Sequence, residues 1–281
     1  MSNCIVCNHD EKTPLYRGID RCLSCGHVAA DLSISSEELF KLYQKDYFFG
    51  EEYSDYVADK RIAQKNFALR LKTLKQFLRP ERHRTLFEIG CAYGFFLEKA
   101  QALFEKAQGI DITEDGIRYA LNELNLDVVQ ADFLSHDLGD RTFDVACMWD
   151  TIEHLPNPHL YVEKLSRHME KGSLIAITTG DIDSFNARMR KENWRLIHPP
   201  THIHYFSQKS LAQMLNNYGF DVVYSRHCGF YRSLDNVAYN ILVLRWKQPK
   251  LYHFLKKLRL TELDFYLNLY DIMYVIARKR Y

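Results

Sequence analysis

Short apolar segments alternate with amphipathic segments between Thr85 and Gly180, and this alternation limits the fold more than any other feature. Apolar strands of about six residues separated by helices predict a doubly wound α/β fold with a parallel sheet. Ligands of such folds bind at the carboxyl ends of the strands. The expected strands are 85–90, 107–112, 127–132, 143–150 and 172–180, and the expected helices are 91–106, 114–124 and 158–169.

The first expected strand ends in the turn Glu88-Ile89-Gly90-Cys91-Ala92-Tyr93-Gly94. Its glycines allow a ligand to approach the backbone closely. Asp111 ends the second strand, where a carboxylate can accept hydrogen bonds from ribose hydroxyls. A nicotinamide cofactor would also suit these residues. However, Ala92 and Phe95 occupy the second and third glycine positions of a GxGxxG motif that begins at Gly90.

The segments FEIGCAYG, GID, AD, FDVACMWDTIEHL and EKGSLIAITT resemble, in order and spacing, the class I S-adenosylmethionine-dependent methyltransferases. The resemblance is particularly to the broad group that includes the ubiquinone-biosynthesis O-methyltransferases. The resemblance covers roughly residues 85–281 and implies a Rossmann-like sheet of seven strands, the last one antiparallel. Ala92 departs from the family, which often has a middle glycine there, so the methionine pocket should be reshaped by one methyl group.

The same resemblance implies a role for each residue of the expected cofactor site. The turn would frame the methionyl part, Asp111 would hold the ribose and Ile112 would pack on the adenine. Asp132 and Phe133 would meet the adenine amino group and face, and Asp150 would lie beside the transferred methyl group. The implied cofactor-binding residues are Glu88, Gly90, Cys91, Gly94, Asp111, Ile112, Asp132, Phe133 and Asp150.

Two carboxylates and an imidazole follow the fourth strand in the segment DTIEHL. If a helical turn begins there, Asp150, Glu153 and His154 share one face. Three interpretations remain open: base chemistry on an acceptor hydroxyl, a divalent-ion site, or side chains that only brace the loop. Ubiquinone and small-RNA 3′-end methyltransferases carry acid-x-x-Glu-His, which implies a site for magnesium, manganese or iron at these three residues. The aspartate at position 150 is one carbon shorter than their glutamate.

A second group of histidines follows the fifth strand, at positions 198, 202 and 204. Histidine titrates close to neutral pH, so such a group suggests proton handling or metal binding, although each histidine also has a solvated or capping interpretation. By the resemblance, His202 or His204 would complete the divalent-ion site. The candidate catalytic residues are Asp150, His154, His202 and His204.

Four of the seven cysteines form two CxxC pairs near the beginning of the sequence: Cys4, Cys7, Cys22 and Cys25. Two such pairs predict a zinc ribbon with a closed tetrahedral shell of four thiolates. A module of about 30 residues buries too little apolar surface to fold unaided, so zinc should supply much of its folding free energy. We expect a structural zinc rather than a catalytic metal, with iron, a redox role or unbound thiols as the alternatives.

The remaining sequence predicts a helical connector or lid at 32–80 and a methyltransferase domain at 81–281 behind the ribbon at 1–31. Rings in the stretch YQKDYFFGEEYSDY predict either packing onto the main domain or a lid over a ligand. A helical insertion is expected at about 234–266. Its basic and apolar segment LVLRWKQPKLYHFLKKLRL is compatible with helical packing, a substrate lid or a membrane-surface contact.

Charge and hydropathy narrow the classes of partner. There are 37 basic and 36 acidic residues, which leaves no global basic field for nucleic acid. No uncharged apolar run reaches the roughly 18 residues of a membrane span, so a cytoplasmic protein is expected.

The leading hypothesis is methyl transfer to oxygen of a small molecule or a nucleotide- or lipid-linked sugar. Its alternatives are an RNA- or ribosome-associated methyltransferase that binds through the ribbon, and a non-catalytic cofactor-binding module. The oligomeric state is left open.

Overall fold

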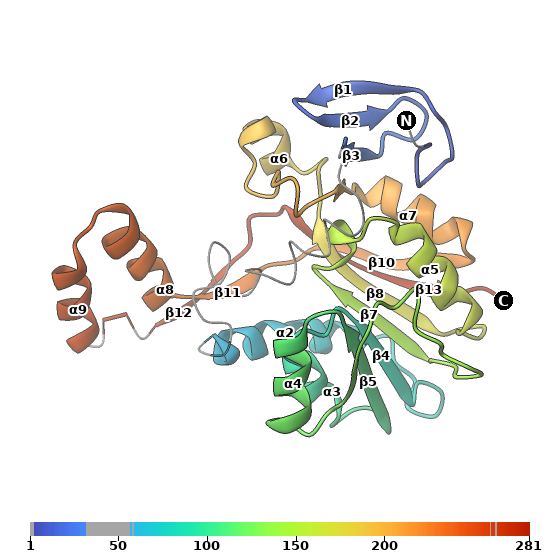
Figure 1. Cartoon of the computed structure of the whole chain (residues 1–281), viewed down its shortest axis with the longest axis horizontal. Helices are drawn as coiled ribbons and strands as arrows, with labels where there is room; N and C mark the ends of the chain where they lie inside the picture. Colours follow the sequence, from blue (N-terminus) through green and yellow to red (C-terminus); the bar gives the residue numbers. More distant parts are fainter. Residues whose placement is uncertain (1–2, 32–56, 58, 259, 262) are drawn as a thin grey trace.

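The structure has a central sheet, a small β-module of strands β1 to β3, and a helical segment with α8 and α9 that projects away from the sheet (Figure 1). The computed structural model describes residues 3–31, 57, 59–258, 260–261 and 263–281. The aromatic-rich stretch and most of the predicted connector before Lys60 lie outside the described residues. Among the described residues, no helix has both the length and the apolar content needed to cross a lipid bilayer.

The central sheet has seven strands, as the sequence predicted. Only β13 runs antiparallel to its neighbours β8 and β10. Every residue of β7 is buried, which is expected for a strand covered on both faces. In spatial order the strands are β10 (Phe220–His227), β13 (Ile272–Lys279), β8 (Leu174–Gly180), β7 (Val145–Trp149), β4 (Thr85–Ile89), β5 (Lys106–Asp111) and β6 (Asp127–Gln130).

Helices cover both faces of this sheet, and alternate residues of β7 show how the two cores divide. Ala146 and Met148 pack with α5 and α7, whereas Val145, Cys147 and Trp149 pack with α2 and α3. The period of two along a strand produces this division. The helices are α2 (Lys60–Leu74), α3 (Phe95–Ala100), α4 (Glu114–Asn122), α5 (Pro158–Arg167), α6 (Phe185–Arg190) and α7 (Gln208–Asn217), with 3-10 turns η1 (Ile152–His154) and η2 (Lys191–Asn193).

Residues 3–31 form a β-module, which we call the ribbon. Its strands are β1 (Lys12–Tyr16), β2 (Ile19–Cys22) and β3 (Val28–Ala30). The sheet continues into β9 (His204–Tyr205), because Val28 pairs with Tyr205 and Ala29 with His204. The ribbon therefore shares a four-stranded sheet with the segment that follows α6.

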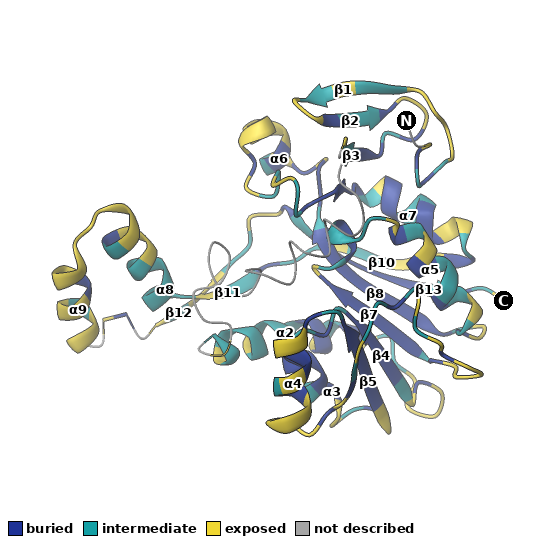
Figure 2. Cartoon of the chain, viewed as in Figure 1, coloured by how far each residue is buried: buried dark blue, intermediate teal, exposed yellow. Residues whose placement is uncertain are grey.

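The described residues between 234 and 263 form the projecting excursion, which we call the arm. Two short antiparallel strands, β11 (Phe230–Ser233) and β12 (Asp264–Leu267), close its base. Between them lie α8 (Leu234–Ala238), the π-helix η3 (Tyr239–Arg245) and α9 (Pro249–Lys257). Much of the arm is exposed, in contrast to the central sheet (Figure 2). A helical insertion was expected in this part of the chain, and its strand-closed base was not.

Candidate cofactor and acceptor site

One large cavity lies at the carboxyl ends of the parallel strands. Its volume is about 1270 Å³, larger than the roughly 300–1000 Å³ of a typical pocket for one small ligand. One side is lined by the turns after β4, β5, β6 and β7, and the other by α2, the loop after β8 and the base of the arm. We call these the cofactor half and the acceptor half. A cavity of this size can hold two ligands side by side.

The turn after β4 is built to let a ligand approach the backbone. Gly90 and Gly94 have backbone φ angles of +78° and +76°. Residues that carry a side chain rarely adopt such positive φ angles. A Cβ atom on Gly90 would lie 2.6 Å from the Thr151 side chain, and one on Gly94 would lie 2.3 Å from Leu126. Ala92 has a positive φ of 45° as well, so the alanine occupies a backbone conformation that favours glycine.

Glu88 is buried and lines the cofactor half of the cavity. Its Oε2 atom has no hydrogen-bond partner among the described residues. Burial and the nearby carboxylate of Asp111 raise the pKa of Glu88 well above its usual value. A buried carboxyl group with an oxygen that lacks a hydrogen-bond partner strongly favours a cationic or hydrogen-bond-donating ligand.

Asp111 ends β5 and faces the same cavity. Its carboxylate accepts hydrogen bonds from the Ala92 amide at 2.7 Å, the Thr113 amide at 2.8 Å and the Thr113 hydroxyl at 2.6 Å. These bonds fix the carboxylate at the mouth of the glycine turn. Burial raises the pKa of Asp111 even though the hydrogen bonds oppose that effect.

The turn after β6 brings Asp132 and Phe133 to the cavity, opposite Ile112. The Tyr161 hydroxyl donates to Asp132 at 2.8 Å, and the Tyr161 ring stacks on Phe133 with centroids 5.6 Å apart. An apolar floor beside a fixed carboxylate suits a planar heterocycle with an amino group. Cys91 also lines the cavity, but its side chain packs into the core on the α3 side of the sheet.

Asp150 follows β7 and is exposed to the cavity. Its φ angle is +50°, and its amide donates to the Thr178 carbonyl at 3.0 Å. The 3-10 turn η1 begins only at Ile152, so the helical turn predicted to start at Asp150 does not form. Among the described residues, the compact metal-competent group here contains Glu153, His154 and His202, without Asp150. This group differs from the predicted set of Asp150, Glu153 and His154 in having His202 in place of Asp150.

His154 and His202 meet in the acceptor half, with ring centroids 4.6 Å apart. Each Nδ1–H donates to a backbone carbonyl, that of Thr201 for His154 and that of Leu196 for His202, both at 2.9 Å. Each ring therefore carries its lone pair on Nε2. Burial lowers the pKa of His154 to about 3 and that of His202 to about 4. Both imidazoles are thus neutral at neutral pH.

The other two predicted histidines do not line the cavity. His204 lies in β9, where its Nε2–H donates to the Pro156 carbonyl at 3.2 Å and its Nδ1 lies 3.2 Å from His27 Nε2 of the ribbon. Strand pairing sets its position outside the cavity lining, and the catalytic role of His204 stays a prediction. His198 is exposed, with Nδ1 2.7 Å from the Thr201 hydroxyl.

Two successive backbone hydrogen bonds link the ribbon, by way of Ile203, to the acceptor half. The Ala30 amide donates to the Ile203 carbonyl at 2.8 Å, and the Ile203 amide donates to the Glu153 carbonyl at 2.9 Å. Ile203 directly follows His202 in the chain. The ribbon therefore holds the backbone on both sides of the histidine pair.

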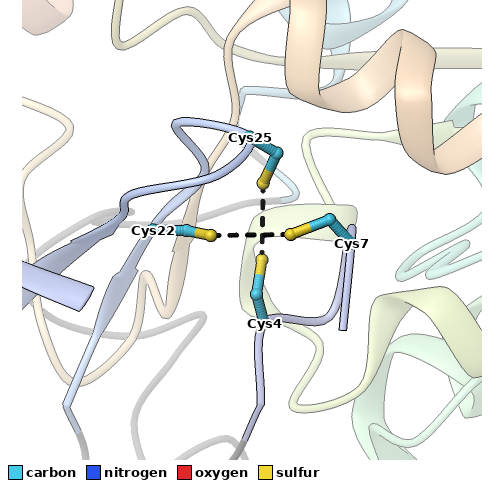
Figure 3. A group of neighbouring side chains, drawn as sticks. All are labelled: Cys4, Cys7, Cys22 and Cys25. Atoms are coloured by element: carbon cyan, nitrogen blue, oxygen red, sulfur yellow. Dashed lines mark hydrogen bonds between the residues drawn. The ribbon is translucent and has the colours of Figure 1, made fainter. Parts of the chain in front are cut away.

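The four ribbon cysteines converge on one point (Figure 3). The Sγ atoms of Cys4 and Cys25 lie 3.5 Å apart, as do those of Cys7 and Cys22. A tetrahedral ion with bonds of about 2.3 Å needs sulfurs about 3.8 Å apart, so the cluster fits zinc. The Asn8 and Gly26 amides donate to the carbonyls of Cys4 and Cys22, which gives the two CxxC turns the same geometry.

Several residues of the acceptor half carried no motif in the sequence. Helix α2 contributes one face to the cavity, and the loop after α6 adds Arg195, which pairs with the buried Asp271 at 2.9 Å. The apolar spacing of the sequence predicted a helix at α2. The position of that helix over the strand ends depends on long-range packing, which the sequence pattern does not indicate. Cavity residues of this kind are Asp59, Ile62, Asn66, Arg70, Arg195, Phe230, Asn236 and Tyr239.

The strand order, with the cavity at the strand ends, is that expected of a methyltransferase sheet. Residues 60–225, more than half of the chain, match the family model of a methyltransferase domain. The chain belongs to this family. The match begins at α2, so this helix falls inside the family's region.

Individual relatives are more distant. A ubiquinone biosynthesis O-methyltransferase of Glaesserella parasuis is 28% identical over 106 residues, 34% of this chain and 45% of the relative. An (S)-tetrahydroprotoberberine N-methyltransferase of Eschscholzia californica is 31% identical over 113 residues, 37% of this chain and 31% of the relative. The chain spans about half or less of the length of these curated relatives.

Solved structures show the same fold at low identity. A SAM-dependent methyltransferase from Archaeoglobus fulgidus superimposes with a TM-score of 0.53 at 20% identity, covering 83% of this chain and 100% of that one. The residues found here fit S-adenosylmethionine, the cofactor implied by the family. Glu88 presents a buried carboxylate that would suit a cationic group such as the methionyl ammonium, and substituents on Gly90 or Gly94 would clash with neighbouring side chains.

Proposed function

We propose that the protein transfers the methyl group of S-adenosylmethionine to an oxygen of a small-molecule acceptor. The observation that carries this proposal is one cavity whose cofactor half adjoins the neutral pair His154 and His202. Similarity to relatives named O- and N-methyltransferases of small molecules supports the class of acceptor.

The cofactor half would orient the donor. Bound S-adenosylmethionine supplies a methyl group on a cationic sulfur, which is open to in-line attack. Glu88 would hold the ammonium group, Asp111 the ribose hydroxyls, and Asp132 with Phe133 the adenine. Positioning of this kind is the main catalytic contribution that a methyl transfer needs from a protein.

The acceptor half would prepare the nucleophile. An alcohol is a poor nucleophile, and His202 Nε2 can accept its proton because burial keeps the imidazole neutral. The bond from Nδ1–H to the Leu196 carbonyl fixes this tautomer. Asp150, exposed in the cavity, would orient the acceptor hydroxyl.

A divalent ion is the second role we propose for this pair. Ligand atoms of Glu153, His154 and His202 lie within 4.8 Å of one another. Two imidazoles and one carboxylate suit manganese, iron or zinc better than magnesium, which prefers oxygen ligands. The ribbon cluster is proposed to hold a separate, structural zinc.

Within the small-molecule class, we propose that the acceptor is a sugar hydroxyl. The sugar would belong to a nucleotide-linked or lipid-linked glycan precursor. The support is the cavity volume and the polar side chains around the acceptor half, among them Asn66, Arg195 and Asn240. The combination of an N-terminal ribbon with this domain also resembles sugar methyltransferases.

An acceptor panel would test the reaction. Sugar nucleotides, lipid-linked sugars and catechols are incubated with S-adenosylmethionine, with chelator, magnesium or manganese, and S-adenosylhomocysteine release is measured. We expect a sugar to turn over, and His202→Ala to lower kcat at least about 100-fold, within the range of general-base effects. The affinity for S-adenosylmethionine should stay unchanged in that variant.

The exposed His198→Ala is the matched control and should retain turnover. Rescue of the metal-free enzyme by manganese, lost in His154→Ala, would assign the pair to a metal rather than to proton transfer. Full activity of His202→Ala under every condition would remove the pair from the mechanism.

A further inference from the structure

The arm carries exposed apolar side chains that its own folding does not use. Within residues 234–258 only Leu242 and Tyr252 are buried apolar residues. Trp246 is 60% exposed and Phe254 is 58% exposed. Other exposed apolar side chains in and beside the arm are Ile241, Leu244, Leu251, Leu258, Leu260 and Leu263.

The arm nevertheless has a defined interior. Asp235 accepts hydrogen bonds from the Tyr252 hydroxyl at 3.1 Å, from Lys256 at 2.9 Å and from the Thr261 hydroxyl at 2.8 Å. The ring of Tyr239 packs edge-on against Tyr252, with centroids 5.4 Å apart. The exposed residues are therefore held on a folded element.

Helix α9 separates an inner from an outer face. Tyr252 and Leu255 face inward, being buried and half-buried. Leu251, Phe254 and Leu258 are exposed and lie three and four residues apart, so they form one stripe along the helix. At 100° per residue, Lys250 and Lys257 border that stripe on one side.

The second part of the arm carries charges of one sign, which are basic. From Arg245 to Leu260 the sequence has six basic residues and no acidic one, although the whole chain is close to neutral. Lys256 is engaged with Asp235, whereas Arg245, Lys247 and Lys250 are exposed. An apolar stripe bordered by lysines complements a surface that is apolar inside and anionic at its edge.

We propose that the arm docks onto an anionic lipid bilayer, with the stripe at the acyl boundary and the lysines among the headgroups. Leucines outnumber aromatic rings on this surface, which favours lipid over stacked nucleic-acid bases. Asn236, Tyr239, Asn240 and Leu244 of the arm line the cavity, so docking would bring the acceptor half close to the membrane. Vesicle binding is independent of the proposed reaction.

Sedimentation with vesicles tests the proposal on the full chain. Vesicles of phosphatidylcholine alone are compared with vesicles that contain phosphatidylglycerol, at low and high salt. Trp149 and Trp194 are buried, so a blue shift of tryptophan emission on binding reports Trp246. We expect binding and a blue shift only with the anionic vesicles, and weaker binding at high salt.

Two arm variants sharpen the test. Lys247→Glu with Lys250→Glu should weaken partitioning on the order of twentyfold, since each lysine near an anionic surface contributes about a fivefold factor. Leu251→Ser with Phe254→Ser should abolish the interaction. Lys209→Glu on α7 and Phe185→Ser on α6 alter exposed residues outside the arm and should change partitioning less than twofold.

Circular dichroism and thermal unfolding show that each variant is folded. Absence of binding to anionic vesicles would overturn the proposal, and so would equal binding by the arm variants. Equal affinity for neutral and anionic vesicles contradicts the role of charge. Binding of single-stranded RNA that the same arm variants abolish, without vesicle binding, would assign the arm to nucleic acid instead.

Discussion

The ribbon and the arm are both additions to the methyltransferase sheet, and they join it in opposite ways. The ribbon buries Val6 and Val28 in cores shared with α7 and Trp194, and its sheet continues into β9. The arm is joined by two short strands and by polar contacts with α2, such as Asn236 to Asp59 at 2.6 Å. The apolar residues of the ribbon are therefore part of the domain core, whereas those of the arm face outward.

This difference separates two uses of an added module. Loss of the ribbon should disturb the site, because its strand holds Ile203 and, through it, Glu153. Loss of the arm should leave the sheet and the cofactor half intact. Three predictions test this contrast, beginning with the largest expected effect.

Replacing two ribbon thiolates, Cys22→Ser with Cys25→Ser, should release the metal and unfold the ribbon. Structural zinc contributes on the order of 10 kcal/mol in small modules, so the loss should propagate into the shared core. Hydrogen exchange should rise at the amides of Ala30 and Ile203. Turnover should fall at least about 100-fold, while S-adenosylmethionine affinity changes less than about threefold.

Cys228→Ser, a half-buried thiol outside the ribbon, is the matched control and should keep its metal content and exchange pattern. Unchanged protection at Ile203 in the metal-free double variant would show that the ribbon does not hold the acceptor half.

Acidification should weaken the ribbon side of the site. Burial lowers the pKa of His204 and His202 to about 4 and that of His154 to about 3. Since the unfolded pKa is about 6.5, the unfolded chain binds more protons between these values. The stabilisation is therefore complete above about pH 6.5 and is lost as the pH falls toward 4. When the pH falls from 6.5 to 5.5, protonation linked to each of these histidines should lower the free energy of unfolding by about 1 kcal/mol.

Denaturant titrations at several pH values would measure this slope. His204→Gln should make it shallower, whereas His253→Gln, at an exposed position of the arm, should leave it unchanged. A slope that is the same in both variants would contradict the placement of His204 in the buried junction.

Excision of the arm should have the smallest effect on the core. Ser233 and Asp264 are paired directly across β11 and β12, so a two-residue Asn-Gly turn can replace residues 234–263. We expect cooperative unfolding, S-adenosylmethionine affinity within about threefold of the full chain, and loss of acceptor turnover. Loss of cofactor binding in this variant would show that the arm is part of the core.

The cofactor half could be predicted from the sequence because each of its elements is local. A glycine turn follows one strand, Asp111 ends the second, and Asp132 follows the third. The fold followed from the same alternation of strands and helices. The CxxC spacing likewise predicted the convergence of four thiols.

The acceptor half could not be predicted to the same extent, because it is assembled from segments far apart in the chain. β9 has only two residues, and its pairing with the ribbon decides that His204 braces the site while His202 lines the cavity. The positive φ of Asp150 is set by the hydrogen bond to Thr178 on the next strand. Neither interaction leaves a local pattern in the sequence.

The most direct test of the central claim is calorimetric titration of the metal-assayed protein with S-adenosylmethionine, S-adenosylhomocysteine and NAD. The account predicts micromolar binding of the first two ligands and none of the third. Asp111→Ala should weaken that binding by about 1–3 kcal/mol, the scale of a buried hydrogen bond to a charged group. Binding of NAD alone would contradict the account and would identify the cavity as an oxidoreductase site.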